Sequence, residues 1–396
     1  MTEAVSPAVS PTPPLPAYGR SSLADLVPSL LAALGVAGFP NPLSIDPLQG
    51  VCLLLIDGLG SEPLNLRADV APFLHAAASR NPPLTACFPA TTATSIASIG
   101  TGLPPGDHGL VGYAFAVPGH DRAMNALKWE LYGSGPEHDL RKELPPERFQ
   151  PRPTAFERAA ADGVRVSLVG PPHLARSALE RAVLRGGRYS GALSLGDLAF
   201  SAARLCVEPL HDRRFVYAYH PGLDTTGHVR GVASDAWALE LSNVDRLAAS
   251  IADRLTAGTA LVVTGDHGMV DLEPEERLEL EDEPGLASGV RLLAGEARAR
   301  HVHTVPGAES DVLDAWRSLV GDRMWVVSRE QAVVEGWFGA SVSDSVRPRI
   351  GDVVAAAFGR IGIFQRSVDA MQPSFVGNHG SLTRDEQLVP FAVMRP

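Results

Sequence analysis

The sequence predicts an α/β protein with a mostly parallel central sheet. A continuous apolar run, VCLLLIDGLG at 51–60, has the character of a strand buried on both faces, which is typical of parallel sheets. Segments with strand and helix patterns then alternate along the chain, as they do in βα units. The composition agrees with a globular protein, because 45% of the 396 residues are hydrophobic and 20% are charged.

The individual elements come in the order that such a fold requires, with helices flanking the sheet. The predicted strands are short apolar runs that end at turn residues, and the predicted helices repeat apolar residues every three to four positions. In chain order they are the strand 51–60, the helix 153–163 closed by Gly163, the strands 164–170 and 214–220, the helix 234–255 and the strand 259–268.

The chain divides into a leader and one large domain. Five prolines between positions 6 and 16 predict that residues 1–20 are extended and disordered. Residues 21–396 would form the domain, with a small inserted α+β lid at about 271–350. The insert begins with the acid-rich stretch DLEPEERLELEDEPG, and the main sheet would resume after it, at 351–359.

Charge and cysteine content exclude several classes of partner. The net charge of −11 argues against nucleic acid polymers and membrane surfaces, since both need a basic surface, but it allows a small anionic substrate. No apolar run approaches the roughly 20 residues that span a bilayer. The three cysteines show no CxxC spacing and predict neither a disulfide framework nor a thiolate metal site. Without a signal-like segment, a cytoplasmic location is expected.

Possible metal ligands come directly after three of the predicted strands. Ligands bind beyond the carboxyl ends of parallel strands, so side chains at these positions could meet. Two of them lie four residues apart, which places both on one face of a helical turn. Three carboxylates and three imidazoles suit zinc, or less well manganese or iron. The six residues are Asp57, Asp224, His228, Asp266, His267 and His379.

Each of these residues also has an ordinary structural interpretation when it is taken alone. Asp57 could cap a helix or form a turn, Asp224 with His228 could be a solvated helix face, and His379 could be a turn residue. A dinucleotide-binding fingerprint after residue 56 is excluded, because Pro63 stands where the third glycine is needed. The metal site is therefore predicted from the whole set.

Residues 88–113, FPATTATSIASIGTGLPPGDHGLVGY, predict a helix that begins with hydroxyl side chains. The first turn carries Thr91, Thr92, Thr94 and Ser95. A helix N-terminus favours an anion, and a threonine alkoxide needs a metal to form at neutral pH. Alternatively, Thr91 or Thr92 is an ordinary N-cap.

Five segments, in this order and spacing, resemble the type I phosphodiesterase/nucleotide pyrophosphatase family of the alkaline phosphatase superfamily. They are LLLIDGLG, FPATTATSIASIGTGLPPGDHG, DTTGHVRG, TGDHGM and GNHGS, between residues 51 and 381. The resemblance implies an alkaline-phosphatase-like fold with two divalent metal ions, zinc first among the candidates. It implies a first ion held by Asp224, His228 and His379. It implies a second ion held by Asp57, Asp266 and His267, with the Thr92 hydroxyl as both ligand and nucleophile.

The function that this resemblance implies is that of a metal-dependent hydrolase. Such an enzyme would cleave phosphodiester or pyrophosphate bonds in a small phosphorylated substrate, through a covalent phospho-threonine intermediate. Ser95 stands where nucleotide pyrophosphatases carry an asparagine, and Ser95 and Tyr113 are expected to contact the substrate. The aromatic residues Tyr113, Phe115 and Trp129 could instead pack the lid against the core. The alternatives on the same site are a phosphomonoesterase, a phosphonate hydrolase or a metal-binding module without activity.

Overall fold

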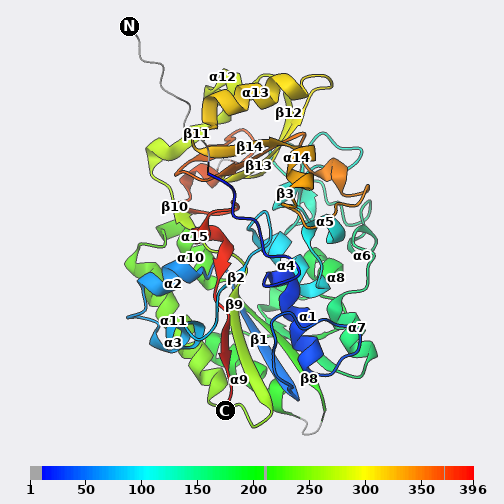
Figure 1. The fold of residues 1–396 in the computed structure, drawn as a ribbon, viewed down its shortest axis with the longest axis vertical. Helices are drawn as coiled ribbons and strands as arrows, with labels where there is room; N and C mark the ends of the chain where they lie inside the picture. The colour runs from blue at the N-terminus through cyan, green and yellow to red at the C-terminus, as the bar shows by residue number, and fades with distance from the viewer. Residues whose placement is uncertain (1–10, 209–211, 370) are drawn as a thin grey trace.

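A six-stranded sheet forms the centre of the fold (Figure 1). The computed structural model describes residues 11–208, 212–369 and 371–396. Neighbouring strands run parallel, except that β19 pairs antiparallel with β9. The prediction of an α/β protein with a mostly parallel central sheet is confirmed. In sheet order the strands are β19 (Ala392–Met394), β9 (Thr259–Gly265), β1 (Gly50–Ile56), β8 (Arg214–His220), β6 (Arg165–Gly170) and β7 (Arg188–Gly191).

Helices cover both faces of this sheet, which explains why β1 is apolar throughout. Side chains alternate along a strand, so Val51, Leu53 and Leu55 pack into one core with α1, α4, α7 and α8. The residues between them pack into a second core with α3, α9 and α11. These helices are α1 (Leu23–Ala33), α3 (Pro72–Ala78), α4 (Thr92–Thr101), α7 (Ala155–Ala161), α8 (Ala178–Val183), α9 (Leu195–Val207) and α11 (Asp235–Ala252).

A second sheet, entirely antiparallel, forms a subdomain at the far end of the molecule from the chain's C-terminus (Figure 1). The segment predicted as a lid supplies most of it. Its core contains the buried Trp316 and Val302. Its elements are α12 (Pro284–Ala287), β12 (Val290–Glu296), β13 (Ala299–Thr304), α13 (Glu309–Val320), β14 (Met324–Ser328), α14 (Arg329–Val334) and β15 (Val353–Ala357), with the sheet order β12-β13-β15-β14.

The prediction that the main sheet resumes at 351–359 is wrong. β15 pairs antiparallel with both β13 and β14 in the second sheet. The main sheet is completed instead by β19, near the end of the chain. A run of small apolar residues such as Val-Val-Ala-Ala-Ala predicts a buried strand, but it carries no information about which sheet the strand joins.

Shorter elements connect the two sheets and the helical layers. The helices are α2 (Ser61–Leu66), α5 (Pro105–His108), α6 (Pro146–Phe149), α10 (Gly222–Arg230) and α15 (Arg384–Gln387). The short strands are β2 (Leu84–Thr85), β3 (Ala114–Phe115), β4 (Met124–Asn125), β5 (Glu130–Leu131), β10 (Val270–Asp271), β11 (Arg277–Glu279), β16 (Gly362–Phe364), β17 (Gly377–Asn378) and β18 (Leu388–Val389).

Part of the predicted leader packs against the domain. The sequence predicts disorder over residues 1–20, of which the first ten lie outside the described residues. Further along, the indole nitrogen of Trp325 donates a hydrogen bond to the Pro11 carbonyl oxygen. The Tyr18 hydroxyl donates to the Trp337 carbonyl oxygen at 3.1 Å. Pro11 and Tyr18 thus contact the domain, and the disorder of residues 1–20 stays a prediction.

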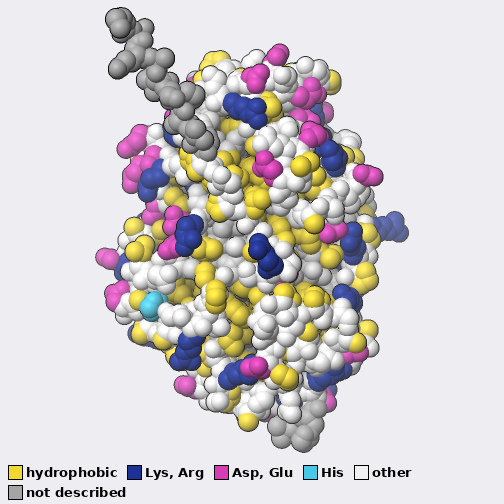
Figure 2. All heavy atoms as spheres, in the orientation of Figure 1, with side chains coloured by type: hydrophobic (Ala, Val, Ile, Leu, Met, Phe, Trp, Pro, Cys, Tyr) yellow, Lys and Arg dark blue, Asp and Glu magenta, His cyan; other side chains and the backbone are white. Residues whose placement is uncertain are grey.

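The surface charges and the character of the helices agree with the globular composition of the sequence. On the face drawn in Figure 2, basic and acidic side chains are interspersed. Within the part of the chain that the structure describes, no helix has the length and apolar character needed to cross a membrane. Cys52, Cys87 and Cys206 are all free and buried.

Candidate functional site

The carboxyl ends of three neighbouring strands meet at one edge of the central sheet. Ile56, the last residue of β1, pairs with the last residues of both β8 and β9. Asp57 and Asp266, which come directly after β1 and β9, therefore emerge close together. The Gly58 backbone N–H crosses between the two strands and donates to Asp266 Oδ1 at 2.9 Å. Both aspartates are buried, at 4% and 0% exposure.

Helix α10 comes after β8 and carries the next two side chains. Asp224 and His228 lie one turn apart, and His228 Nε2 is 3.4 Å from Asp224 Oδ1. Gly58 allows α10 to approach this closely, because a Cβ at this position would lie 2.9 Å from Asp224 Cα. The backbone of Gly58 also has a positive φ of 73°, which favours glycine.

Helix α4 begins at the same edge. Thr91 is the N-cap residue, with extended backbone angles, and Thr92 is the first residue of the helix. Thr92 Oγ1 lies 3.4 Å from Asp57 Oδ1 and 3.3 Å from His267 Nε2. The free N–H groups and the dipole of a ten-residue helix favour negative charge at this point. The hydroxyl thus lies among the predicted ligands at a position suited to an anion.

Three histidine rings lie close together at the site. The rings of His267 and His379 stack at 3.7 Å between centroids, and the rings of His228 and His379 are 5.1 Å apart. Each Nδ1 lies within hydrogen-bond distance of a backbone carbonyl oxygen, namely Gly377 O for His228 at 2.8 Å, Gly268 O for His267 at 3.0 Å and Ala90 O for His379 at 2.9 Å. Each Nδ1 therefore carries a proton, and the Nε2 lone pairs of His228 and His267 are free for a metal.

Two groups of ligand atoms are close enough to hold a cation each. Within each group the atoms lie within 4.8 Å of one another, and Asp224 belongs to both groups. Asp266 is in neither group, although its Oδ2 is 3.6 Å from His267 Nε2. The structure thus brings all six predicted ligands and Thr92 to one place. The groups are Asp224 with His228 and His379, and Asp224 with Asp57 and His267.

Burial shifts the pKa values of these groups. Burial, together with the neighbouring Asp266, raises the pKa of Asp57 well above its usual value. Burial raises the pKa of Asp224 and of Asp266 to about 6. Burial also lowers the pKa of His228 and of His267. Three buried carboxylates are therefore costly to ionise together unless positive charge compensates them.

The donor atoms fit divalent cations. Among the described residues, Asp224 Oδ1 and Asp266 Oδ2 are buried without a hydrogen-bond partner. Each oxygen faces an imidazole Nε2, that of His228 at 3.4 Å and that of His267 at 3.6 Å. Two lone pairs that face each other at this distance repel, and a cation between them removes the repulsion. A mixed set of carboxylate oxygens and imidazole nitrogens is one that zinc prefers.

Two cavities open beside Thr92. The first, of about 330 Å³, has a polar wall that includes Asp224, His228, Glu296 and Lys128. The second, of about 260 Å³, is mostly apolar. The apolar cavity is lined by Thr92, Ile96, Leu179, Leu184, Tyr189 and Tyr219, among others.

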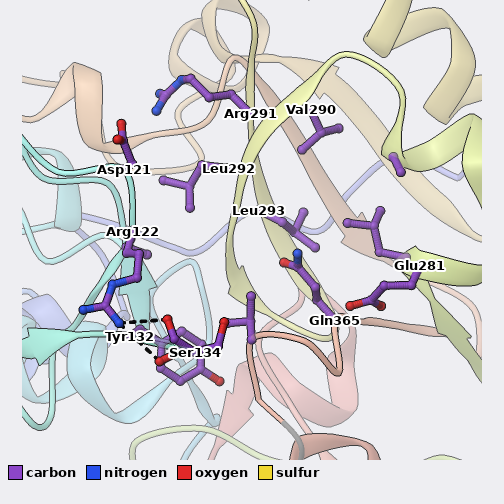
Figure 3. Close-up of a pocket in the computed structure, with 15 residues that line it drawn as sticks. Asp121, Arg122, Tyr132, Ser134, Glu281, Val290, Arg291, Leu292, Leu293 and Gln365 are labelled. Atoms are coloured by element: carbon purple, nitrogen blue, oxygen red, sulfur yellow. Dashed lines mark hydrogen bonds between the residues drawn. The ribbon is translucent and has the colours of Figure 1, made fainter. Parts of the chain in front are cut away.

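A third cavity, of about 350 Å³, lies between β12 and the segments just before β4 and just after β5 (Figure 3). Its wall contains none of the six predicted ligands. Arg122, one of the charged residues in the wall, donates to the Ser134 and Pro136 carbonyl oxygens, both at 2.9 Å. Its guanidinium is therefore used to hold a local turn.

The residues expected to contact the substrate lie in different environments. Tyr113 lines the polar cavity next to Thr92, and its ring packs edge-on against Tyr132. Ser95 is fully buried, and its hydroxyl donates to the Asp266 carbonyl oxygen at 2.7 Å. This hydrogen bond joins α4 to the end of β9. Phe115 and Trp129 are also fully buried and pack into the main core.

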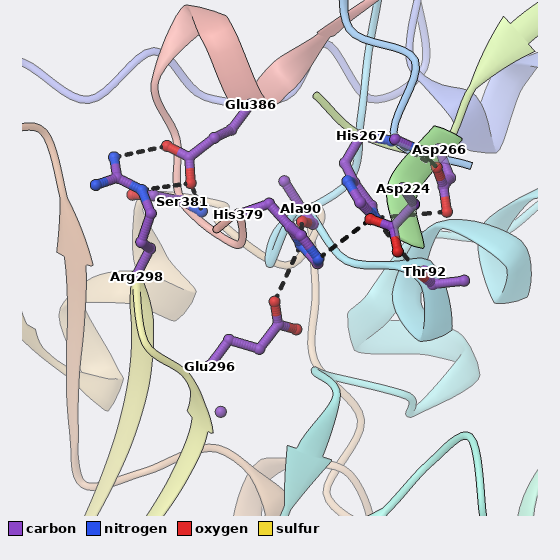
Figure 4. Close-up of polar contacts among 12 residues, drawn as sticks. Ala90, Thr92, Asp224, Asp266, His267, Glu296, Arg298, His379, Ser381 and Glu386 are labelled. Carbon is purple, nitrogen blue, oxygen red and sulfur yellow. Dashed lines mark hydrogen bonds and ion pairs between the residues drawn. The ribbon is translucent and has the colours of Figure 1, made fainter. Parts of the chain in front are cut away.

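Two residues near the site were not predicted from the sequence. The Tyr219 hydroxyl donates a hydrogen bond to Asp57 Oδ2. In the sequence, only the position of Tyr219 at the end of a predicted strand could have indicated that it lies near the site. Glu296 Oε2, from the second sheet, lies 3.1 Å from His379 Nδ1 (Figure 4). Burial lowers the pKa of His379, but the Glu296 and Asp224 carboxylates and the Ala90 carbonyl oxygen together outweigh burial and raise it to about 10.

Comparisons with known proteins agree with this geometry. The family model of the type I phosphodiesterases/nucleotide pyrophosphatases matches residues 51–382. Among solved structures, murine ectonucleotide pyrophosphatase/phosphodiesterase 5 is similar, with a TM-score of 0.64, 18% identity and 88% of each chain covered. An inactive variant of the murine protein in complex with AMP gives a TM-score of 0.63 and 18% identity, covering 87% of this chain and 88% of that one. The human protein gives 0.63 and 17%, with 88% of each chain covered.

A sequence search of the curated proteins found no match. The solved structures show an alkaline-phosphatase-like fold, and the family model covers most of the chain, including all five segments noted in the sequence. The chain belongs to the type I phosphodiesterase/nucleotide pyrophosphatase family of metal-dependent hydrolases, in the alkaline phosphatase superfamily.

Proposed function

We propose that this enzyme hydrolyses a phosphodiester or pyrophosphate bond in a small substrate, with two divalent cations, zinc first among the candidates, and Thr92 as the nucleophile. The supporting observation is the position of Thr92 Oγ1, 3.3 Å from His267 Nε2 and 3.4 Å from Asp57 Oδ1. Asp224, His228 and His379 would hold one cation. Asp57, Asp266 and His267 would hold the other, with the Thr92 oxygen.

The residues of this chain divide the chemistry between them. Bound divalent cations would favour ionisation of the hydroxyl and of a water molecule, and would offset negative charge on the transferring group. Thr92 Oγ1, after losing its proton to solvent, forms a bond to phosphorus while the leaving-group oxygen departs on the opposite side. Water then breaks the bond between phosphorus and Oγ1 and restores the hydroxyl. The N-terminus of α4 favours the negative charge that develops during both steps.

The two cavities beside Thr92 favour a diester or a pyrophosphate. The phosphorus of a diester carries an organic group on each side, and that of a pyrophosphate carries an organic group on one side and a phosphoryl group on the other; Thr92 lines one polar and one apolar cavity. Tyr113 would contact the group in the polar cavity, and the apolar cavity would take a group with an aromatic or aliphatic surface. Because a related protein was solved with AMP, nucleotide substrates are the first to test. Ser95, whose hydroxyl is used within the fold, would make no contact with the substrate.

A second candidate, a phosphomonoesterase or phosphonate hydrolase, has one observation in its favour. Lys128 lines the polar cavity and could pair with a doubly charged phosphoryl group or with a substrate carboxylate. However, its Nζ lies 3.4 Å from Glu130 Oε1, and its side chain is 68% exposed. The lysine charge is therefore partly compensated and well solvated, which makes this candidate the weaker one.

A substrate panel distinguishes these candidates. The zinc-loaded protein would be assayed with an aryl phosphodiester, a dinucleoside pyrophosphate, an aryl phosphomonoester and a phosphonate, and compared by kcat/KM. We expect the diester or the pyrophosphate to be preferred, and the Thr92→Ala variant to be inactive at equal metal content. A preference for the monoester or the phosphonate would support the second candidate. Absence of turnover in the whole panel would support a metal-binding module.

We also propose a cytoplasmic location. The support is that all three cysteines are free and buried, as in proteins of a reducing compartment. Cell fractionation of the native host with an antibody to this protein would test it, and recovery of the protein outside the cytoplasm would contradict it.

A further inference from the structure

The turn between β12 and β13 extends from the second sheet to the proposed metal site (Figure 4). Glu296 is the last residue of β12 and pairs with Ala299, the first residue of β13, so the turn has two residues. Glu296 Oε2 lies 3.1 Å from His379 Nδ1. Glu296 is 8% exposed and His379 is 8% exposed, so this contact is shielded from water.

His379 differs from the other two histidines of the site in the groups that lie beside its Nδ1 atom. His228 and His267 each donate from Nδ1 to a backbone carbonyl oxygen. His379 Nδ1 has the Ala90 carbonyl oxygen at 2.9 Å and, in addition, the Glu296 carboxylate. A carboxylate that accepts from Nδ1 makes Nε2 a stronger donor to a metal and fixes the orientation of the ring. Of the three rings, only that of His379 has a carboxylate on its Nδ1 side among the described residues.

The same turn is fixed to the loop that carries His379. The Arg298 guanidinium donates to both carboxylate oxygens of Glu386, each at 2.8 Å, and both side chains are almost fully buried. Glu386 Oε1 also accepts from the Ser381 backbone N–H at 2.9 Å. Glu386 Oε2 accepts from the Thr383 hydroxyl. One buried ion pair therefore ties the turn to the residues just after His379.

The backbones approach closely at the contact itself. Gly380 has a positive φ of 130°, and a Cβ at this position would lie 3.2 Å from Glu296 Oε2 and 3.4 Å from Ala299 Cβ. A larger residue at 380 would press on the Glu296 carboxylate. Glu296 Oε1 is buried without a hydrogen-bond partner among the described residues. The ion-pair contact of Glu296 is made by Oε2, with His379.

We propose that Glu296 is a positioning residue for His379, and that the second sheet thereby contributes to the metal site of the first. Glu296 lies beside the His379 Nδ1–H, which donates to the Ala90 carbonyl oxygen, and its negative charge holds the ring with Nε2 toward Asp224 and His228. Arg298 and Glu386 keep the turn in place. This inference rests on the proposed two-cation site, because His379 would be one of its ligands.

The test compares zinc binding by the full-length wild-type protein and by Glu296→Gln, which preserves size and removes the charge. Metal-free protein is titrated with zinc in competition with a chromophoric chelator. We expect two ions in the wild type and, in Glu296→Gln, one ion bound about 10–100-fold more weakly, as for other carboxylates behind histidine ligands. The weakened ion should be the one that His228→Ala weakens. Glu275→Gln, an exposed glutamate of the same inserted segment, is the matched control and should bind both ions as the wild type does.

A spectroscopic measurement separates positioning from a general effect on folding. In the zinc-loaded protein, the His379 Nδ1 proton should give a downfield NMR signal that shifts in Glu296→Gln and is unchanged in Glu275→Gln. Undiminished affinity for both ions in Glu296→Gln would overturn this inference and leave the proposed function intact. Equal weakening of both ions would also overturn it, because the effect would not be local to His379. A wild-type protein that binds no zinc would instead contradict the proposed function.

Discussion

The substitution Asp224→Asn should stabilise the metal-free protein while it removes one of the two proposed zinc ions. Asp224 is buried, its Oδ1 has no hydrogen-bond partner among the described residues, and burial raises its pKa from 3.8 to about 6. Because the pKa of Asp224 is higher in the folded than in the unfolded state, its carboxyl does not lower the free energy of unfolding below about pH 4. The free energy of unfolding falls as the pH rises through 6 and the carboxyl ionises. At ~1.4 kcal/mol per pKa unit, the buried charge lowers the free energy of unfolding by about 3 kcal/mol above pH 7. Asparagine has no such charge.

The assay is urea unfolding of metal-free wild type and Asp224→Asn at pH 8 and at pH 4. We expect the variant to be more stable by up to about 3 kcal/mol at pH 8, and the two proteins to differ little at pH 4. With zinc present at about 1,000 times its Kd, the order should reverse, since one bound ion adds about 4 kcal/mol to the wild type. Asp344→Asn, at an exposed position, should change neither value. A metal-free variant that is less stable than the wild type at pH 8 would refute the reasoning.

Three further predictions concern the residues around Asp224. Thr92→Ala should abolish turnover at unchanged metal content, and Thr92→Ser should retain part of the turnover. Thr91→Ala should lower the free energy of unfolding by about 0.5–2 kcal/mol. Kinetics, metal analysis and melting curves would show a different pattern if Thr91 were the nucleophile. His228→Ala should lose one zinc ion and lower turnover by orders of magnitude. His108→Ala should lose hydrogen bonds within a buried loop, which lowers the free energy of unfolding by about 1–3 kcal/mol, and should keep both ions. Metal analysis showing the reverse would contradict the assignment. Tyr219→Phe removes the hydroxyl that donates to Asp57, a proposed ligand of the second cation, and should weaken zinc binding about tenfold or more. Unchanged zinc affinity in the chelator competition would show that this hydrogen bond is dispensable.

The central sheet and the meeting of the candidate ligands at its edge could be predicted from the sequence for related reasons. A strand such as β1 is buried on both faces, so it has a continuous apolar run that ends in a recognisable polar residue, Asp57. Parallel strands end at a common edge, so Asp57 and Asp266 meet although they are far apart in the chain. These features are local in sequence or result from one simple rule of topology.

The other features depend on contacts that no local pattern encodes. Glu296 reaches His379 from a different sheet, and nothing in the spacing of the two residues links them. Ser95 lies one turn after Thr92, yet its hydroxyl bonds to the end of β9, because the way α4 lies on the sheet decides where each side chain of its first turn points. For the same reason, β15 was expected in the wrong sheet. Pairing partners and helix orientation are decided by tertiary packing.

The central claim, that Thr92 attacks phosphorus, is tested most directly by trapping the covalent intermediate. The zinc-loaded enzyme would be mixed briefly with an aryl phosphodiester, quenched in acid, digested and mapped by peptide mass spectrometry. We predict that the substituted phosphoryl group is attached to Thr92 and is absent from the Thr92→Ala variant. Attachment to Thr91 or Ser95, or full turnover by Thr92→Ala, would contradict this account.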